Sequence, residues 1–591
     1  MELHVENRNY ANYNWTNVKS GYEDIPIKCP NPLEQKLFHG SIYHPDTDLL
    51  LPSPILKNKK IPGILILEGN KTYGRQRKTS SSGKGRLYYR CIPQNKHLPI
   101  FLIPYEPAMD FSKHQVNLFV LFEYKEWTAS HAPYGILTET IGKVSDLSAY
   151  YEYLLYVRGM HFSHQTIINQ KIRQTKMKNG FHFDPKPNTK PNPGIFIFSI
   201  DPQGSKDLDD AFSIHHTKHE NDEYMYVIRI YISDMVYWAS HFQLWDDLRL
   251  EKTGANTLYL PDRNRVMIPS ILSDQKASLL ADGDLKPVMV YELEISLHSG
   301  KVVGNRFYRD QVFIHANYRY DTEVLEKCEH YRHMFEVTRK WTSLGGYENN
   351  IQDSHELVAY WMVEYNRAVG KELSEIGRGI YRVCVQKLPE TESQEGEPEW
   401  KRIMRYWKSD VKGQYAFYSS ELETMVHYGM GGGYEVYYYY AHASSPIRRM
   451  VDIYNQSCLV NKMDSGVGFG LDIGAVEGMR IFQTEMEKTE TLVELNRQTS
   501  ESKRVQMECE MLAAFFSCPD IETVEYEGTV MDIDVLRGAW VYLSFWKRVV
   551  FVGVGEGGYE DISIGDRKKC QIFLFEEEEK ANRKVAVRFV G

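Results

Sequence analysis

The segment IFIFSIDPQGSKDLDDAFSIH, residues 195–215, places four acids between two apolar runs, IFIFSI and AFSI. The acids are Asp201, Asp207, Asp209 and Asp210. Short apolar runs of this kind are typical of buried strands, so the carboxylates between them are expected to lose hydration and to repel one another. A multivalent cation relieves both costs, and ligands that are all oxygen atoms favour Mg²⁺, with Mn²⁺ as a second choice.

Two other interpretations of this acidic segment compete with a magnesium site. A bare D-x-D-D pattern is more often an acidic turn at the surface than a metal site. An EF-hand calcium loop fits less well, because the glycine after the third acid and the glutamate that closes such a loop are missing. The flanking strands favour the metal site, and further motifs have to decide.

Length and composition describe a multidomain globular chain. Its 591 residues are too many for one hydrophobic core, and 42% hydrophobic with 25% charged residues is ordinary for a soluble protein. No apolar run is long enough for a transmembrane helix, and the first residues resemble no targeting peptide. The eight cysteines are scattered, without zinc-ribbon spacing, and are expected to be reduced thiols. We therefore expect no membrane association and an intracellular location, with the cytoplasm as first choice and the nucleus as the alternative.

Charge is distributed unevenly along the chain. The net charge of −9 argues against a protein that coats nucleic acid. Between Lys57 and Lys96, however, eleven lysines and arginines accompany a single acid, Glu68. Such a run is usually a solvated face, but among strand-like segments it also suits a surface that follows a phosphate backbone.

The pattern of apolar residues divides the chain into five segments. Runs such as GILIL (63–67) and NLFVLFEY (117–124), separated by turn residues, predict small β-barrels, whereas ELVAYWMVEYNRAVGKELSEI (356–376) predicts a helix. A basic, proline-rich connector is expected at 171–194 and one helical stretch at 484–516. The predicted segments are an N-terminal extension (1–32), a compressed first barrel (33–85), a second barrel (86–165), a mixed domain of strands and helices (166–518) and a third barrel (519–591).

Four segments carry a resemblance to a known family. The string SIDPQGSKDLDDA resembles the signature of the RNase II (RNB) family, in which IDP precedes a D-x-DD-A cluster. Three more segments match in the same order: TLYLPDRNRVMIPSILSDQKASLL (257–280), NRAVGKELSEIGRGIYRVCVQKLP (366–389) and YYAHASSPIRRMVDIY (439–454). The likeness is strong over 195–515 and weaker outside it. It implies an α+β catalytic RNB domain flanked by small OB-fold barrels, two cold-shock-like before it and one S1-like after it.

The resemblance also implies roles for individual residues. The four aspartates would form the catalytic magnesium site, and Asp209 would be the least replaceable of them. Arg448 matches an arginine at the scissile phosphate, and Arg449 is a second candidate for phosphate binding. Tyr320 aligns with a tyrosine that packs on the last nucleotide, and Tyr259 with an aromatic residue that clamps the terminal base. Tyrosine is common in this chain, so only the motif positions support the last two assignments.

The chain also departs from the family pattern. Ala359, Tyr360, Trp361 and Met362 stand where the family has Glu-Glu-Phe-Met, so an acid near the substrate channel is missing, and neither Glu356 nor Glu364 is at the matching position. Cys384 and Tyr231 replace histidines, and the HFTSP segment reads His442-Ala443-Ser444-Ser445-Pro446. These changes predict a divergent member with altered rate or handling of the RNA end, and they leave the metal ligands intact.

The expected function is a metal-dependent 3′→5′ exoribonuclease that hydrolyses single-stranded RNA to nucleoside 5′-monophosphates, and the family suggests a monomer. A catalytically silent, RNA-binding scaffold with the same fold is the alternative. That scaffold predicts loss of at least one metal-site aspartate, and all four are present. A metallophosphatase is a third possibility, but it would not account for the three barrels or for the SSPIRR segment.

Overall fold

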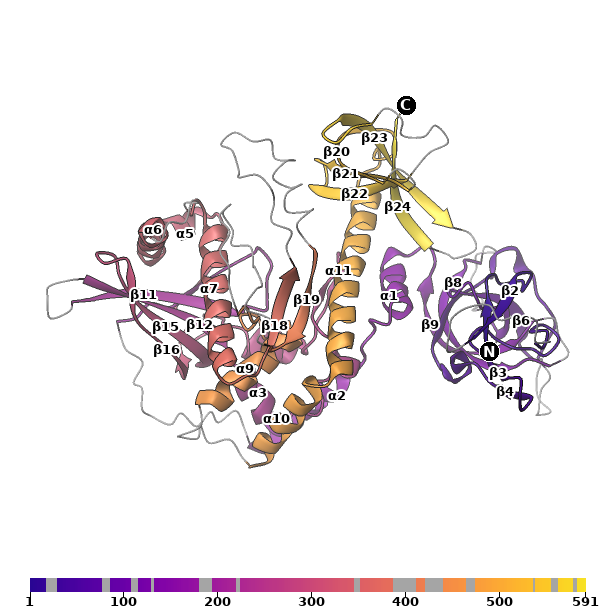
Figure 1. Ribbon diagram of the computed structural model, residues 1–591, viewed down its shortest axis with the longest axis horizontal. Coiled ribbons are helices and arrows are strands. Elements are labelled where there is room, and N and C mark those ends of the chain that lie inside the picture. Colours follow the sequence, from indigo (N-terminus) through magenta and orange to yellow (C-terminus); the bar gives the residue numbers. More distant parts are fainter. Residues whose placement is uncertain are drawn as a thin grey trace. The chain divides into compact units, whose positions relative to one another are not determined.

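The computed structural model shows two compact units (Figure 1). One joins Met1–His161 and Arg504–Gly591 with Leu260–Asp262, and the other joins Phe162–Tyr259 with Arg263–Lys503. No helix among the described residues is long and apolar enough to cross a membrane. The residues that the structure describes are 1–17, 29–76, 85–107, 115–128, 132–179, 194–218, 224–344, 351–385, 411–419, 439–463, 473–534, 537–553, 562–577 and 582–590.

The N-terminal segment forms an antiparallel sheet. Its strands are β1 (Glu2–Val5), β2 (Tyr13–Thr16), β3 (Ile42–His44) and β4 (Leu49–Leu51), in the order β2-β1-β3-β4. The prediction of an irregular extension over 1–32 was therefore wrong for the described part of that range. Strands of three or four residues are too short to show a period of two in the sequence, and pairing with distant strands creates them.

One closed barrel follows this sheet, in the order β5-β6-β7-β9-β8. The predicted strands are confirmed, but the predicted boundary between residues 85 and 86 cuts through this barrel, because β5 precedes it and pairs with β6 and β8 beyond it. In place of two cold-shock-like barrels, the described residues before 160 thus form one barrel and the N-terminal sheet. The barrel strands are β5 (Ile61–Leu65), β6 (Leu87–Pro93), β7 (Phe101–Tyr105), β8 (Leu118–Glu126) and β9 (Tyr134–Lys143).

Two histidines hold the backbone of Val5 in β1. Val5 N donates to His39 Nδ1 at 3.1 Å, and Val5 O contacts His97 Nδ1. The His39 and His97 rings are stacked with centroids 4.6 Å apart, and His4 lies 5.4 Å from His39. Burial first, and then His97 and His4, lower the pKa of His39, while Glu2 opposes them. The hydrogen bond from Val5 requires His39 to be neutral at Nδ1.

We expect this unit to lose stability as the pH falls below about 6.5, the ordinary pKa of histidine. The folded-state pKa of His39 is depressed, so the unfolded chain takes up the proton first. The stabilisation from neutral His39 is complete above the pKa of this histidine in the unfolded chain. It is lost as the pH falls through the pKa of His39 in the folded protein. His39→Asn keeps an acceptor for Val5 but cannot titrate. Between about pH 7.5 and 5.5, the thermal midpoint of the variant is expected to drop less than that of the native protein. Equal drops in the two proteins would contradict this prediction.

A second closed barrel lies near the C-terminus, in the order β20-β21-β22-β24-β23, and confirms the predicted third small barrel. In the same unit, helix α1 (Leu147–Val157) buries three tyrosines, and Tyr150 Oη donates to Arg583 O at 3.1 Å. The barrel strands are β20 (Glu525–Asp534), β21 (Gly538–Leu543), β22 (Arg548–Gly553), β23 (Arg567–Glu577) and β24 (Asn582–Phe589).

The other unit is built on a six-stranded sheet in the order β16-β15-β12-β11-β10-β17. Figure 1 labels β11, β12, β15 and β16 of this sheet. All neighbours are antiparallel except β10 and β17, which are parallel. Isoleucine and other apolar side chains at alternate positions of the middle strands pack in a large core. Their bounds are β10 (Phe198–Asp201), β11 (Asp210–Lys218), β12 (Tyr224–Ser233), β15 (Lys286–Ser296), β16 (Lys301–Val312) and β17 (Ala316–Arg319).

Helices complete this unit, and two predictions about them need correction. The predicted connector at 171–194 begins inside helix α2, and the predicted helical stretch at 484–516 is interrupted between α10 and α11. The helix predicted at 356–376 is confirmed as α7. The helices are α2 (Gln165–Asn179), α3 (Met235–His241), α4 (Leu250–Thr253), α5 (Glu323–Lys327), α6 (Glu329–Leu344), α7 (Ser354–Glu375), α9 (Met450–Met463), α10 (Ile473–Met486) and α11 (Thr489–Ser517), of which α11 belongs to this unit up to Lys503. Two two-stranded sheets are β13 (Leu258–Tyr259) with β14 (Asn264–Arg265) and β18 (Ile380–Val385) with β19 (Val411–Phe417).

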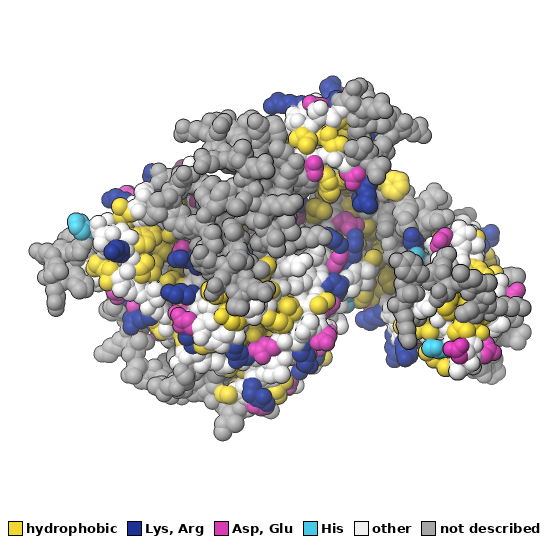
Figure 2. All heavy atoms as spheres, viewed as in Figure 1, with side chains coloured by type: hydrophobic (Ala, Val, Ile, Leu, Met, Phe, Trp, Pro, Cys, Tyr) yellow, Lys and Arg dark blue, Asp and Glu magenta, His cyan; other side chains and the backbone are white. Residues whose placement is uncertain are grey.

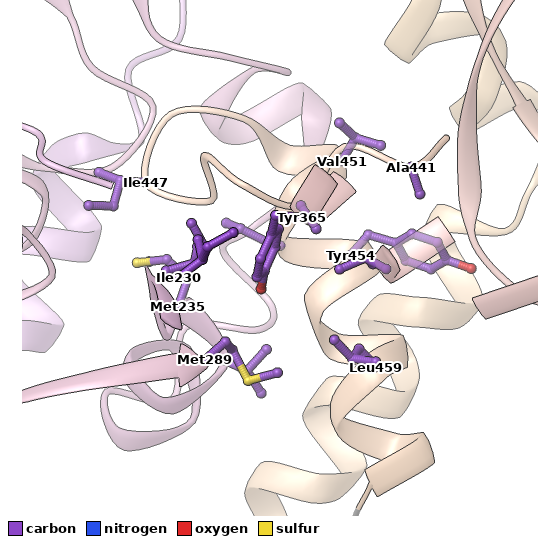
Figure 3. Close-up of a cluster of buried hydrophobic side chains, with 14 of the residues drawn as sticks. Ile230, Met235, Met289, Tyr365, Ala441, Ile447, Val451, Tyr454 and Leu459 are labelled. Carbon is purple, nitrogen blue, oxygen red and sulfur yellow. The ribbon is translucent and has the colours of Figure 1, made fainter. Parts of the chain in front are cut away.

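The core of this unit joins the sheet to helices α7 and α9. In Figure 3, Ile230 and Met289 of the sheet lie on one side of Tyr365 from α7, and Tyr454 and Leu459 of α9 lie on the other. All five side chains are buried. At the surface, Figure 2 shows acidic and basic side chains interspersed, in keeping with the small net charge. Packing of α9 against the sheet brings the segment before α9 to the aspartate cluster.

Candidate active site

The acidic segment lies between two strands of the central sheet. β10 ends at Asp201, and β11 begins at Asp210. Between them the chain reverses at Gly204, whose φ of +87° favours glycine. Leu208 then anchors the loop in the core, because its N–H donates to Ser278 Oγ at 3.0 Å and its carbonyl accepts from Leu279 N at 2.9 Å. The turn and this anchor return the chain to the sheet next to Asp201.

Each aspartate has its own set of hydrogen bonds. Asp201 accepts from Ser199 Oγ at 2.7 Å, and Asp207 accepts from Tyr259 Oη at 2.6 Å. Asp209 accepts from Ile447 N at 2.9 Å and from Arg448 Nε at 3.1 Å, so both of its oxygens are engaged. Asp210 differs from the others, because its Oδ2 is buried and has no hydrogen-bond partner among the described residues.

Burial raises the pKa of three of these carboxyl groups. It raises the pKa of Asp201 to about 6, with Asp207 adding to the effect and the Ser199 hydrogen bond opposing it. It raises the pKa of Asp209 to about 7, against the opposing charge of Arg448. The pKa of Asp210 is raised well above its ordinary value by burial and then by Asp201 and Asp209. Burial and mutual repulsion therefore disfavour the charged forms of these carboxyl groups.

These residues fit a hard divalent cation in their chemistry. The donors are all carboxylate oxygens, and the unpartnered Oδ2 of Asp210 is the kind of buried acceptor that a cation satisfies. Within the described part of the chain, no three acid, histidine or cysteine side chains are already gathered in a metal-binding arrangement. The aspartates are nevertheless close enough to raise one another's pKa values. Asp201, Asp207 and Asp210 are the side chains that could turn toward an ion, since Asp209 is held by Arg448 and the backbone.

The two arginines of the SSPIRR segment have different surroundings. Arg448 donates from Nη2 to Ser445 Oγ at 3.0 Å as well as to Asp209, and its side chain remains 43% exposed. Arg449 donates to Oδ1 of Asp452 at 2.8 Å, and the Asp452 side chain is fully buried. Arg448 is thus the cation beside the carboxylates, whereas Arg449 pairs with the helix that follows it.

Both tyrosines expected to bind substrate lie at the cluster. The Tyr259 hydroxyl donates to Asp207, and burial followed by the charge of Asp207 raises the pKa of Tyr259. Tyr320 N donates to Asp201 O at 3.2 Å. Burial and then the charges of Asp210 and Asp201 raise the pKa of Tyr320. The structure therefore brings seven predicted residues together at one site: Asp201, Asp207, Asp209, Asp210, Arg448, Tyr259 and Tyr320.

Some residues that position this site carried no role in the sequence analysis. Buried Asn366 of α7 accepts from Ala443 N at 2.8 Å and from Ser444 N at 3.1 Å, and thereby fixes the segment before Arg448. Buried Asp452 also accepts from Ser445 N at 2.8 Å. The signal in the sequence is weak. Each is a polar residue in a helix. Polar residues in helices are commonly exposed, so the sequence does not mark these two as buried.

The departures from the family pattern have structural roles where they are described. Tyr360 accepts a hydrogen bond from Trp341 Nε1 at 3.1 Å, and buried Trp361 donates to Thr338 Oγ1 at 3.1 Å. Glu364 accepts from Arg367, and the buried Tyr231 hydroxyl lies 2.9 Å from Ser213 Oγ. The side chain of Cys384 lies outside the described residues. These substitutions therefore serve helix and sheet packing.

Comparison with known proteins supports the resemblance. The RNB domain model matches residues 194–330, and the Dis3-like cold-shock domain 2 model matches residues 88–159. The DIS3-like exonuclease 2 of Schizosaccharomyces pombe is 26% identical over 248 residues, which are 37% of this chain and 24% of that protein. The chain thus spans about a quarter of the length of this relative.

Solved structures agree on the fold. RNase R of Mycoplasma genitalium, in complex with ribose-methylated single-stranded RNA, superposes with a TM-score of 0.66 at 14% identity, covering 91% of this chain and 90% of that one. Yeast Ssd1, a pseudonuclease, superposes with a TM-score of 0.54 at 13% identity, covering 86% of this chain and 66% of that one. The chain therefore contains an RNB domain, at low identity to its relatives, and its fold is similar to that of RNase R.

Proposed function

We propose that this protein is a metal-dependent 3′→5′ exoribonuclease that hydrolyses single-stranded RNA to nucleoside 5′-monophosphates. The observation that carries the proposal is the half-exposed guanidinium of Arg448 held against Asp209, beside the unpartnered carboxylate oxygen of Asp210. Metal-dependent hydrolysis of a phosphodiester needs a cationic side chain that neutralises the charge of the phosphate, and it needs acids that hold the metal ion. Arg448 and the aspartates supply this combination in one place, and RNase R, which has a similar fold, has been solved with single-stranded RNA.

In this mechanism Asp201, Asp207 and Asp210 would hold magnesium, with manganese as an alternative. When bound, the ion supplies an acidified water and offsets negative charge on the phosphate. Arg448 binds the scissile phosphate, since a guanidinium matches phosphate oxygens and stabilises the charge that develops on them. Asp209 holds Arg448 in place. Tyr259 and Tyr320 orient the terminal nucleotide, and Arg449 is a second phosphate ligand only if it leaves Asp452.

The barrels would guide the RNA strand. In the first barrel, Arg90 and Lys71 lie over the ring of Tyr73 at 4.6 and 5.7 Å, so the basic run of the sequence includes an aromatic residue with cations on it. Rings and cations of this kind bind single strands regardless of sequence. Arg77, Lys78 and Lys84 of that run lie outside the described residues. We propose that the C-terminal barrel is S1-like, that RNA is the partner, and that the protein acts as a monomer.

Tyr259→Phe should lower the rate of the chemical step roughly tenfold, because a hydrogen bond to a charged acceptor contributes about 1.5–3 kcal/mol and part of this is recovered by water. The ring remains, so RNA binding should change little. Single-turnover cleavage of saturating RNA measures the rate, and fluorescence anisotropy measures the affinity. An unchanged rate would show that the hydroxyl of Tyr259 does not orient Asp207 for the reaction.

The decisive experiment is a time course on 5′-labelled single-stranded RNA with Mg²⁺, with Mn²⁺, and with EDTA. A second RNA carries a 3′-phosphate that blocks the terminal hydroxyl. The proposal predicts a ladder that collapses to a short product in either metal, no shortening in EDTA, and slower shortening of the blocked RNA. Cleavage at internal positions would contradict the exonuclease, and loss of the label as a mononucleotide would indicate the opposite polarity.

A catalytically silent RNA-binding protein is the second candidate. It is supported by the structural similarity to the pseudonuclease Ssd1 and by the absence of an acid at positions 359–362. The presence of all four aspartates supports the enzyme instead. Tight binding of RNA without shortening, in both metals, would favour the silent protein and overturn the proposal.

A further inference from the structure

The ring of Tyr320 is covered by a residue to which no role has been assigned. His355, in the first turn of α7, stacks on Tyr320 with ring centroids 3.9 Å apart and ring planes 8° from parallel. Parallel rings at this distance attract one another beyond the area that they bury. The His355 side chain is 56% exposed, so burial in the core does not explain this arrangement.

Two hydrogen bonds tie the beginning of α7, and with it His355, to Asp321. His355 Nε2 lies 3.1 Å from Asp321 Oδ2, and Ser354 Oγ donates to Asp321 Oδ1 at 2.9 Å. Asp321 has a φ of +53°, in the left-handed region that side chains rarely adopt. The backbone thus turns sharply after Tyr320, and Asp321 ties that turn to the beginning of α7.

The other connection of Tyr320 leads to the carboxylates. Its N–H donates to Asp201 O at 3.2 Å, where β10 ends. Tyr320 therefore has its backbone fixed to the acidic loop and its ring fixed to α7. A tyrosine side chain has two rotatable torsions, and the stacking on His355 restrains the plane of this ring.

We propose that His355 is a positioning residue that sets the plane of the Tyr320 ring for the 3′-terminal nucleotide. This inference rests on the proposed function. His355 acts through Tyr320 and Asp321, and does not need to touch the RNA. Misplacement of a substrate-orienting group by a small distance costs rate more than affinity, because most of the RNA is bound elsewhere.

The test compares His355→Ala with His355→Phe, which keeps a flat ring but has no nitrogen for Asp321. His355→Ala should lower the single-turnover rate about tenfold, the size of effect that one aromatic stack supports, while its affinity for RNA falls by less than about threefold. His355→Phe should recover the rate to within about threefold of the native protein. His298→Ala, an exposed histidine in the turn between β15 and β16, is the control and should change nothing.

Equal rates for His355→Ala and the native protein would overturn the proposal, as would equal losses in the alanine and phenylalanine variants. A second measurement separates this failure from failure of the exonuclease itself. In EDTA, the native protein should bind a short RNA with an intact 3′-terminal base more tightly than the same RNA with an abasic 3′ end. His355→Ala should lose that preference, whether or not the native protein cleaves RNA, and retention of the preference would refute the positioning role.

Discussion

Asp209→Asn is expected to reduce RNA shortening by about three orders of magnitude, which is the loss seen when a charge-stabilising group leaves a phosphoryl or acyl transfer site. Asp209 uses one oxygen for Ile447 N and the other for Arg448 Nε. Asparagine can still accept the hydrogen bond from Ile447 N through its carbonyl oxygen. Its NH2 group, however, is a donor and would face the guanidinium of Arg448, which is also a donor. Arg448 would then lose the partner that holds it at the phosphate. A time course on 5′-labelled RNA with Mg²⁺ measures the effect.

A binding measurement and a control variant show whether the loss is specific to Asp209. RNA affinity, measured by anisotropy, should stay within about threefold, because in the proposed function the barrels bind most of the strand. Asp246→Asn serves as the matched control, since the Asp246 side chain is 72% exposed. It should retain full activity. If Asp209→Asn kept more than about a tenth of the native rate, Asp209 would not be the residue that holds Arg448 for the reaction.

Asn366→Ala is expected to destabilise the protein by about 3 kcal/mol, since an unsatisfied buried donor costs about 1–3 kcal/mol and two would be created. Asn366 is only 3% exposed. Its Oδ1 accepts from Ala443 N and Ser444 N, and its Nδ2 donates to Tyr440 Oη and Ser444 Oγ, both at 3.1 Å. Alanine would leave two backbone N–H groups buried without acceptors. The free energy of unfolding in urea, followed by tryptophan fluorescence, measures the loss.

The same variant should also lose RNA shortening at temperatures where it is still folded. The segment that Asn366 holds leads within a few residues to Arg448, so a looser segment moves the guanidinium. Asn366→Asp keeps an acceptor and should be less destabilising than alanine. Lys371→Ala, an exposed position on the same helix, should match the native protein in both measurements. A stable Asn366→Ala variant with native activity would show that the segment is held by other contacts.

The sequence by itself determined the parts that rest on local patterns. Residues 117–124 form a short apolar run that is typical of a buried strand, and 356–376 has helical periodicity. Both predictions are confirmed. Four colinear segments, among them the four aspartates and the SSPIRR segment, indicated the RNB family, and the RNB domain model matches residues 194–330. These signals lie within windows of about twenty residues, where chemistry and periodicity can be read directly.

Only the tertiary structure decided which distant segments meet. The strands of the N-terminal sheet are too short to show a period, and the single barrel exists because β5 pairs with strands on both sides of the predicted boundary. Arg448 and Asp209 are 239 residues apart, and Asn366 is 78 residues from Ser444. The stacking of His355 on Tyr320 likewise crosses from a loop to a helix. Such pairings are selected by burial and by the need to satisfy buried polar groups, which depend on the whole folded chain rather than on any local stretch of it.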